Sequence, residues 1–247
     1  METILYIDIE TIPAQRADIL AEIREAKKAE LDEAIAAIKP PGNYKKQESI
    51  DQWMAEESPK IAQGLRDAFE EEVDAEYRRT GLDGAFGQVC VIGWAFDDDR
   101  VVTLHNHDER GLLSDFSTEM NIAKANPFNT TIVGHNVSAF DLRFLMQRHI
   151  INGLKPHPVL SRAAQAKPWE MDKVFDTMVQ WSGVGNRIKL DKLCKALNVP
   201  TPKGDIDGSK VWDFVKAGRI EEVAAYCCRD VEAVRQVHRL MTFQAAA

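Results

Sequence analysis

A short β-rich segment opens the chain, and a long segment typical of helix separates it from the next β-rich segment. Thr3–Ile9 (TILYIDI) is apolar and β-branched, and Pro13 closes the predicted strand. Residues 14–80 are rich in Ala, Glu, Lys and Arg, and a proline-rich break interrupts them at 40–43. Their apolar residues include the stripe of an amphipathic helix, namely Ile19, Ile23, Ile35 and Ile38. Any sheet in this protein must therefore accept a helical insertion directly after its first strand.

The rest of the chain alternates between predicted strands and predicted helices. Strands are predicted over 88–96, 100–105, 130–134 and 173–178, with the acidic triplet Asp97–Asp99 as a solvated turn between the first two. Helices are predicted over 49–79, 110–124, 139–150, 190–197, 209–216 and 221–241. This order favours an α/β fold with a mixed sheet and helices on both faces. We expect a single domain over 1–247, with the insertion at about 14–80.

Composition narrows the class of protein. The chain has 247 residues, of which 45% are hydrophobic and 28% charged, as in a globular protein. No apolar run approaches the ~20 residues of a membrane span, and no secretory signal is evident, so we expect a cytoplasmic protein without membrane contact. Its four cysteines include no Cys-x-x-Cys pair, which argues for reduced thiols rather than disulfides or a structural zinc.

The net charge of −8 argues only weakly against a nucleic-acid partner. Residues 1–108 carry 24 acidic and 12 basic side chains, whereas residues 109–247 carry 15 acidic and 19 basic ones. The acidic total therefore hides a mildly basic second half and does not exclude a phosphate-bearing substrate.

Carboxylates occur in three places that packing explains poorly. Asp8 and Glu10 are two residues apart on the first strand, so both side chains point to one face. Asp141 follows the polar turn after Gly134 and begins a helix, where capping is an equally good explanation. Tyr226 and Asp230 are spaced i, i+4 on one face of the last predicted helix. His135 in the same turn as Asp141 is interpreted as a turn or packing residue.

Taken together, the four carboxylates follow the order of elements that a two-metal phosphoryl-transfer site requires. Hard divalent cations prefer oxygen ligands, and two of them ~4 Å apart can activate a water and stabilise a leaving oxygen. The sequence resembles the DEDD exonucleases, which have an RNase H-like fold. The motifs that carry this resemblance are Asp8-x-Glu10, Asn136-x-x-x-Phe140-Asp141 and Tyr226-x-x-x-Asp230.

The resemblance is to the tyrosine-type branch, and within it to the proofreading domain of family B DNA polymerases and to related stand-alone 3′→5′ exonucleases. It covers roughly 1–13 and 82–243 and implies an RNase H-like mixed five-stranded sheet flanked by helices. Shorter similarities occur around Asp176, around Leu190 and from Lys203 to Val211. Asp176 is interpreted either as a residue that supports the site or as a strand-end cap, and it is not counted among the site residues. The insertion departs from most of the family, although the stand-alone relatives carry one at this place.

The resemblance also implies a mechanism. Asp8, Glu10, Asp141 and Asp230 would hold two Mg²⁺ or Mn²⁺ ions, and Tyr226 would orient the attacking water. Hydrolysis of DNA, or of RNA, would release 5′-mononucleotides from single-stranded 3′ ends. The candidates for holding the terminal nucleotide are Thr11, Asn136 and Phe140, although an aromatic residue on a helix face, such as Phe140, is usually part of the core.

Two competing functions remain open, as does the role of the insertion. They are a non-catalytic nucleic-acid-binding or scaffold protein on this fold, and an RNase H-like endonuclease. For the insertion, which carries more acidic than basic residues, we expect a helical cap near the mouth of the site that limits access to single-stranded ends. The alternative is a purely structural arm, or one that meets a second copy or a replication or repair partner.

Overall fold

The structure is a computed structural model that describes residues 3–106, 108–202 and 206–244. Lys203, in one of the shorter similarities, lies outside the described residues. The sheet has five strands in the order β3-β2-β1-β4-β5. Their bounds are β1 Thr3–Ile12, β2 Gln88–Phe96, β3 Val102–His105, β4 Thr130–Gly134 and β5 Val174–Asp176. β1 pairs antiparallel with β2 and parallel with β4, so it lies at the centre of a mixed sheet.

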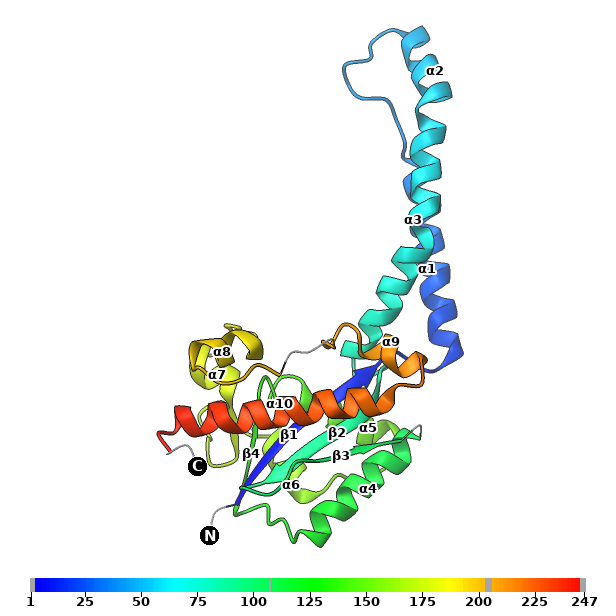
Figure 1. Cartoon of the computed structure of the whole chain (residues 1–247). Coiled ribbons are helices and arrows are strands. Elements are labelled where there is room, and N and C mark those ends of the chain that lie inside the picture. The colour runs from blue at the N-terminus through cyan, green and yellow to red at the C-terminus, as the bar shows by residue number, and fades with distance from the viewer. Residues whose placement is uncertain (1–2, 107, 203–205, 245–247) are drawn as a thin grey trace.

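Helices cover both faces of this sheet (Figure 1). One face packs on α4 (Glu109–Ile122), α5 (Asp141–Ile151) and α6 (Pro158–Ala164). The other face packs on α10 (Ile220–Met241), which runs across the strands and is flanked by α7 (Thr177–Ser182), α8 (Leu190–Ala196) and α9 (Val211–Lys216). The expected fold class, a mixed five-stranded sheet flanked by helices, is therefore confirmed.

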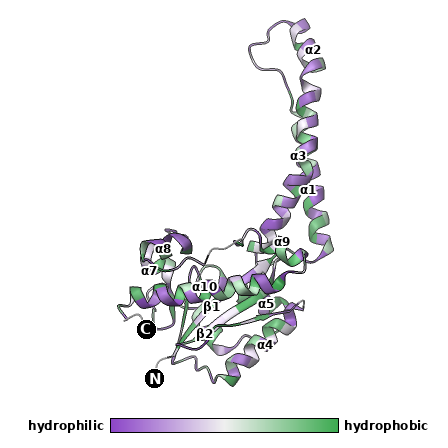
Figure 2. Ribbon diagram, in the orientation of Figure 1, coloured by the Kyte–Doolittle hydropathy of each residue, from purple (hydrophilic) through white to green (hydrophobic). Residues whose placement is uncertain are grey.

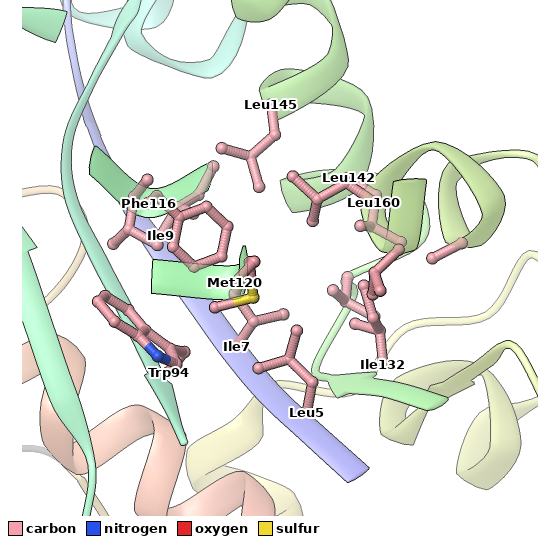
Figure 3. Close-up of a cluster of buried hydrophobic side chains, with 14 of the residues drawn as sticks. Leu5, Ile7, Ile9, Trp94, Phe116, Met120, Ile132, Leu142, Leu145 and Leu160 are labelled. Carbon is pink, nitrogen blue, oxygen red and sulfur yellow. The ribbon is translucent and has the colours of Figure 1, made fainter. Parts of the chain in front are cut away.

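The alternation of side chains along β1 divides the interior into two cores. Leu5, Ile7 and Ile9 point to the α4–α6 side, where they join Phe116 and Leu145 in the largest buried cluster (Figure 3). Tyr6 points the other way and packs on the buried valines of α10. Because the strand has a period of two, Asp8 and Glu10 belong to the α10 side. The same alternation that builds the core thus aims both carboxylates at one helix.

Several predicted boundaries were wrong by two or three residues: β1 ends at Ile12 rather than at residue 9, α5 begins at Asp141 rather than at residue 139, and α9 begins at Val211 rather than at residue 209. Two short helices, α6 and α7, were missed. The strand predicted over 173–178 ends at Asp176, because the Asp176 side chain accepts hydrogen bonds from the backbone N–H groups of Met178 and Val179 and so starts α7. The edge strand β3 begins at Val102 rather than at residue 100.

The insertion forms an arm that projects from the body of the protein (Figure 1). It consists of α1 (Ala17–Ala36), α2 (Gln47–Glu56) and α3 (Ser58–Arg79), followed by a 3₁₀ turn over Thr80–Leu82. α2 continues into α3, and α3 packs along α1, with Arg24 of α1 paired to Glu70 of α3 across the two helices. Hydrophilic and hydrophobic residues alternate along this arm (Figure 2).

Among the described residues, the recorded contacts between the arm and the body lie near the base of the arm, and its helices project away from the body (Figure 1). The expected packing of the arm as a cap near the mouth of the site is therefore not observed, and its effect on access to the site stays a prediction. The Tyr77 hydroxyl donates to the Ala14 carbonyl, and its ring meets that of Trp212 on α9 edge to face. Arg78 donates to both carboxylate oxygens of Asp213, also on α9. The apolar stripe is covered partly by the arm itself: Ile19 is buried, while Ile23, Ile35 and Ile38 are half-buried. No helix among the described residues has the length and apolar character needed to cross a membrane.

Candidate active site

Asp8 and Glu10 face α10, which approaches the sheet closely at this point. Asp8 pairs with Gly93 of β2, and a Cβ at Gly93 would lie 2.7 Å from the sulfur of Cys227. The missing side chain therefore lets α10 approach the sheet beside Asp8. The Cys227 thiol donates to Asp8 Oδ2 at 3.4 Å, and the donor atoms of Asp8, Glu10 and Cys227 lie within 4.8 Å of one another.

Asp141 reaches the same place from the other direction. It occupies the first turn of α5, it is 4% exposed, and its Oδ1 accepts a hydrogen bond from the backbone N–H of Ile9 at 3.1 Å. Ile9 lies between Asp8 and Glu10, so this bond fixes Asp141 against the acidic segment of β1. The N-cap position of α5 is Phe140, and no side-chain hydrogen bond caps this helix. The alternative that Asp141 serves as a cap is therefore not supported, and its carboxylate is instead bonded across to β1.

The four carboxylates repel one another strongly. Burial, then the charge of Asp230, raises the pKa values of Asp8 and Glu10 well above the usual range. Burial raises the pKa of Asp141 to about 7 and that of Asp230 to about 6. Nearby like charges and loss of water both disfavour the ionised form, so the cluster holds protons that separate carboxylates would release.

This donor set fits divalent cations. Carboxylate oxygens are the ligands that Mg²⁺ and Mn²⁺ prefer, and a cation relieves the repulsion that raises these pKa values. The thiol of Cys227 adds a softer donor at the edge of the cluster, although burial raises its pKa well above the ordinary value and keeps it protonated. The oxygen atoms are thus the ligands available at neutral pH.

Tyr226 stands one helical turn before Asp230 on α10. Burial, followed by the charges of Asp230 and Glu10, raises the pKa of Tyr226 far above its ordinary value. The hydrogen bond between the two side chains lowers the pKa of Asp230. A phenol in this setting remains protonated and donates, so it can orient a water but cannot remove a proton from it at neutral pH.

The turn between β4 and α5 is held by Asp176, whose role the sequence left open between a strand-end cap and a supporting residue. Its carboxylate accepts the backbone N–H groups of Asn136 and Ser138 in addition to those that start α7. Asn136 has a φ of +62°, which a non-glycine residue adopts only when its surroundings hold it. Gly134 is required beside it, because a Cβ there would lie 2.5 Å from that of Val137.

His135 lies in the same turn as a packing residue, as the sequence suggested. Its Nδ1 is 2.9 Å from the Thr177 hydroxyl, and its Nε2 is 2.9 Å from the carbonyl of Ile188. Burial lowers its pKa, so the neutral ring bridges α7 and the loop before α8. The turn that carries Asn136 is therefore fixed from both sides.

The three candidate nucleotide-binding residues lie in different settings. Asn136 lines an open pocket beside the turn. Phe140 is half-buried, packs against the main core and has its ring centre 5.5 Å from that of Phe144, which agrees with the alternative of a core aromatic residue. The Thr11 hydroxyl donates to the carbonyl of Gly81 at the base of the arm, just after a register shift in β1.

A family model matches more than half of the chain. Residues 85–238 match the model of a family described as predicted 3′–5′ exonucleases related to the exonuclease domain of PolB. The chain belongs to this family. The match to the PolB-related exonucleases begins after the arm and includes the motifs around Asp141 and Asp230.

The fold has a counterpart among solved structures. The chain is similar to the family B DNA polymerase from the hyperthermophilic archaeon Pyrobaculum calidifontis, with a TM-score of 0.53 and 15% sequence identity. The similarity covers 98% of this chain but 25% of the polymerase chain, and at this identity it shows the fold alone. No curated protein matches this member of the PolB-related exonuclease family.

Sequence reasoning missed Cys227 and Gly93. Cys227 was assigned to the core, where it is, but its contact with Asp8 was not foreseen. The helical spacing of Cys227 and Asp230 (i, i+3) was the available signal, since it places both on the side of α10 that Tyr226 borders. Gly93 gave no signal, because a glycine within a strand does not reveal which helix approaches it.

Proposed function

We propose that this protein is a metal-dependent 3′→5′ exonuclease that hydrolyses DNA, or RNA, and releases 5′-mononucleotides. The observation that carries the proposal is the meeting of Asp8, Glu10, Asp141 and Asp230, from three elements far apart in the chain, with Tyr226 beside Asp230. Membership of a family of predicted 3′–5′ exonucleases supports it. The expected substrate is a single-stranded 3′ end, which is narrow enough to reach a cluster set between a sheet and a helix.

These four carboxylates would hold two Mg²⁺ or Mn²⁺ ions, which would supply activation of water and stabilisation of the departing 3′ oxygen. The chain's own groups do the rest. Ile9 N–H holds Asp141 in place, and Cys227 does the same for Asp8. The protonated hydroxyl of Tyr226 orients the attacking water, and the turn at Asn136 positions the terminal nucleotide.

Linear and circular substrates test this proposal. The purified protein should degrade 5′-end-labelled single-stranded DNA or RNA from the 3′ end in Mg²⁺ or Mn²⁺, and Asp8→Ala or excess EDTA should stop it. A circular single strand should stay intact, because an exonuclease needs an end.

The same assay distinguishes the competing functions. Cutting of the circle would indicate an endonuclease. Binding of either substrate without hydrolysis by the wild-type protein would indicate a non-catalytic nucleic-acid-binding protein, and both outcomes would overturn the proposal.

A further inference from the structure

A pocket of about 340 Å³ opens beside the Asn136 turn and is separate from the acidic cluster. Its volume lies in the range of small-molecule sites, roughly 300–1,000 Å³. Its walls come from the turn before α5 and the first turn of α5, from the end of α6 and the segment after it, from β5, and from α7 and the loop after α7. We call it the α5–α7 pocket, and the lining residues used below are Asn136, Arg143, Lys167, Val174, Met178 and Arg187.

The rim of the α5–α7 pocket is positively charged. Arg143, Lys167 and Arg187 are all exposed, and within the described ranges Arg143 and Arg187 form no ion pair that the structure records. The acidic groups nearby are already engaged. Asp176 accepts four backbone N–H groups, and Glu170 pairs with Lys173. The pocket therefore presents two guanidinium groups to an anion, and guanidinium matches the geometry of phosphate.

The floor of the pocket is apolar. The buried side chains of Val174 and Met178 contribute to it, together with the alanine and proline of the segment after α6. Next to this segment Trp169 is 73% exposed, with the ammonium group of Lys167 5.4 Å from its ring centre. An apolar floor, a nearby exposed aromatic ring and a cationic rim are the combination with which proteins hold the bases and backbone of single-stranded nucleic acid.

The pocket lies next to the acidic cluster. Asn136 lines it and lies five residues before Asp141, while Arg143 lies in the same first turn of α5 as this aspartate. The charge of Asp176, which also lines the pocket, contributes to the raised pKa of Asp141. A strand whose last nucleotide is at the cluster therefore has this pocket within reach of its next nucleotide.

We propose that the α5–α7 pocket binds the nucleotide that precedes the 3′-terminal one, with phosphate against Arg143 and Arg187 and the base against the apolar floor. This inference rests on the proposed exonuclease function and adds a site that makes the enzyme prefer longer single strands to one-nucleotide substrates. One-nucleotide substrates do not use the pocket, whereas longer single strands do. The walls are pre-formed, because His135 bridges α7 and the following loop.

The test compares a double variant of the rim with a control of equal charge change. The rim variant is R143A/R187A, and the control is R66A/R100A, which removes two exposed arginines from α3 and from the turn before β3. Each full-length protein is assayed on the 4-nitrophenyl ester of thymidine 5′-monophosphate and on a tetrathymidylate. We expect the rim variant to raise KM for the tetranucleotide about tenfold and to leave the ester unchanged.

A binding measurement gives an independent readout. Fluorescence anisotropy of a labelled twelve-residue oligothymidylate is followed in Ca²⁺ over a range of salt. The logarithm of the association constant falls linearly with the logarithm of the salt concentration, by about 0.7 per phosphate that the protein neutralises on a single strand. Loss of two arginines should therefore make this slope less steep by about 1.4 in the rim variant. The control should retain the wild-type slope.

The outcomes separate this inference from the proposed function. An unchanged slope and an unchanged tetranucleotide KM in the rim variant would overturn the inference. Failure of the wild-type protein to hydrolyse either substrate would instead overturn the proposed function, while anisotropy would still decide whether the pocket binds the strand.

Discussion

The body and the arm of this protein handle charge in opposite ways. In the body, four carboxylates lie together at the face of a sheet, where burial raises the pKa values of all four and like charge raises those of Asp8, Glu10 and Asp141 further. In the arm, acidic side chains are exposed and most of the recorded interactions pair them with basic ones, as between Arg24 and Glu70, where the partner lowers the pKa of the carboxyl group. Charge thus opposes folding in the body and mildly supports it in the arm.

The exposed ion pairs of the arm are replaceable, whereas the buried carboxylates of the body are under functional constraint. An exposed pair such as Arg24–Glu70 contributes about 0–1 kcal/mol, and other residues can replace it. Buried like charges are retained against the free energy of folding, which is expected only where a ligand of opposite charge compensates them. The proposed cation site therefore explains a feature of the body that packing alone would remove.

The largest difference between the two regions should appear when one carboxylate is neutralised in each. We expect Asp230→Asn to lower the hydrolysis rate about 1,000-fold or more, because a ligand to the proposed cations is lost. Glu70→Gln on the arm should leave the rate unchanged. Single-turnover assays on end-labelled single strands measure both. Comparable rates for Asp230→Asn and the wild type would remove Asp230 from the site.

The hydroxyl of Tyr226 should matter less than a carboxylate. Tyr226→Phe retains the ring and removes only the group that orients water, so we expect a loss of ~10–1,000-fold in the single-turnover rate. Calorimetric titration with Mn²⁺ should show that cation binding persists. On the arm, Tyr77→Phe is the matched control and should leave the rate unchanged. If the two phenylalanine variants behave alike, Tyr226 is a packing residue.

Buried repulsion should make the stability of the body depend on pH. The pKa values of Asp141 and Asp230 are raised on folding to about 7 and about 6, so their contribution is fully present below pH 4 and is lost as pH rises through these values. We expect the free energy of unfolding in EDTA to fall by about 4 kcal/mol between pH 5 and pH 8.

Urea titrations at several pH values, with and without Mg²⁺, measure this dependence. Added Mg²⁺ should flatten it, and Asp230→Asn should weaken it, whereas Glu70→Gln should not. A metal-free protein equally stable at both pH values would contradict the repulsion described here.

Glycine to alanine changes should have opposite signs in the two regions. Gly93→Ala puts a methyl group 2.7 Å from Cys227, so we expect a destabilisation of about 1–3 kcal/mol and slower hydrolysis as α10 moves away from Asp8. Gly64→Ala lies in α3 with open space around it and should stabilise by about 0.5–1 kcal/mol. Thermal unfolding and initial rates measure both, and a neutral Gly93→Ala would show that α10 is not held closely here.

Removing the arm should have the smallest effect on chemistry. Ile12 and Gln88 are paired across β1 and β2, so a short glycine-containing turn can replace residues 14–80 between them. Since the acidic cluster takes no residue from α1–α3, we expect rates on short single strands within about twofold of wild type. Loss of activity in a variant whose circular dichroism shows a folded body would restore a role for the arm at the site.

The sequence was sufficient to predict most of the body. β2 and β4 have the predicted bounds because apolar runs between turn residues leave few alternatives, and the carboxylates of β1 were placed on one face by the period of the strand. The arm was predicted as helix but not in its position. The apolar stripe of α1 is partly covered because α1 and α3 pack on each other. The helical spacing of Ile19 and Ile23 would be the same if the stripe packed on the sheet, so the sequence could not distinguish the two arrangements.

The details of the site depended on contacts that no local pattern encodes. The hydrogen bond from Ile9 N–H to Asp141 joins β1 to the start of α5, 132 residues away, and Cys227 reaches Asp8 only because residue 93 has no side chain. The role of Asp176 was left open for the same reason. One carboxylate that caps α7 also holds the Asn136 turn, and the second function appears only in three dimensions.

The distance along the chain between Asp8 and its partners on α10 has a consequence for synthesis. Cys227 and Asp8 are separated by 219 residues, so the contact between them is among the most non-local that this chain can form. Such contacts form late, and a chain emerging from the ribosome has its first strand long before its last helix. Until α10 docks, the acidic residues of β1 lack Asp230 and Tyr226. The acidic cluster, and with it the proposed activity, is therefore complete only once α10 has docked.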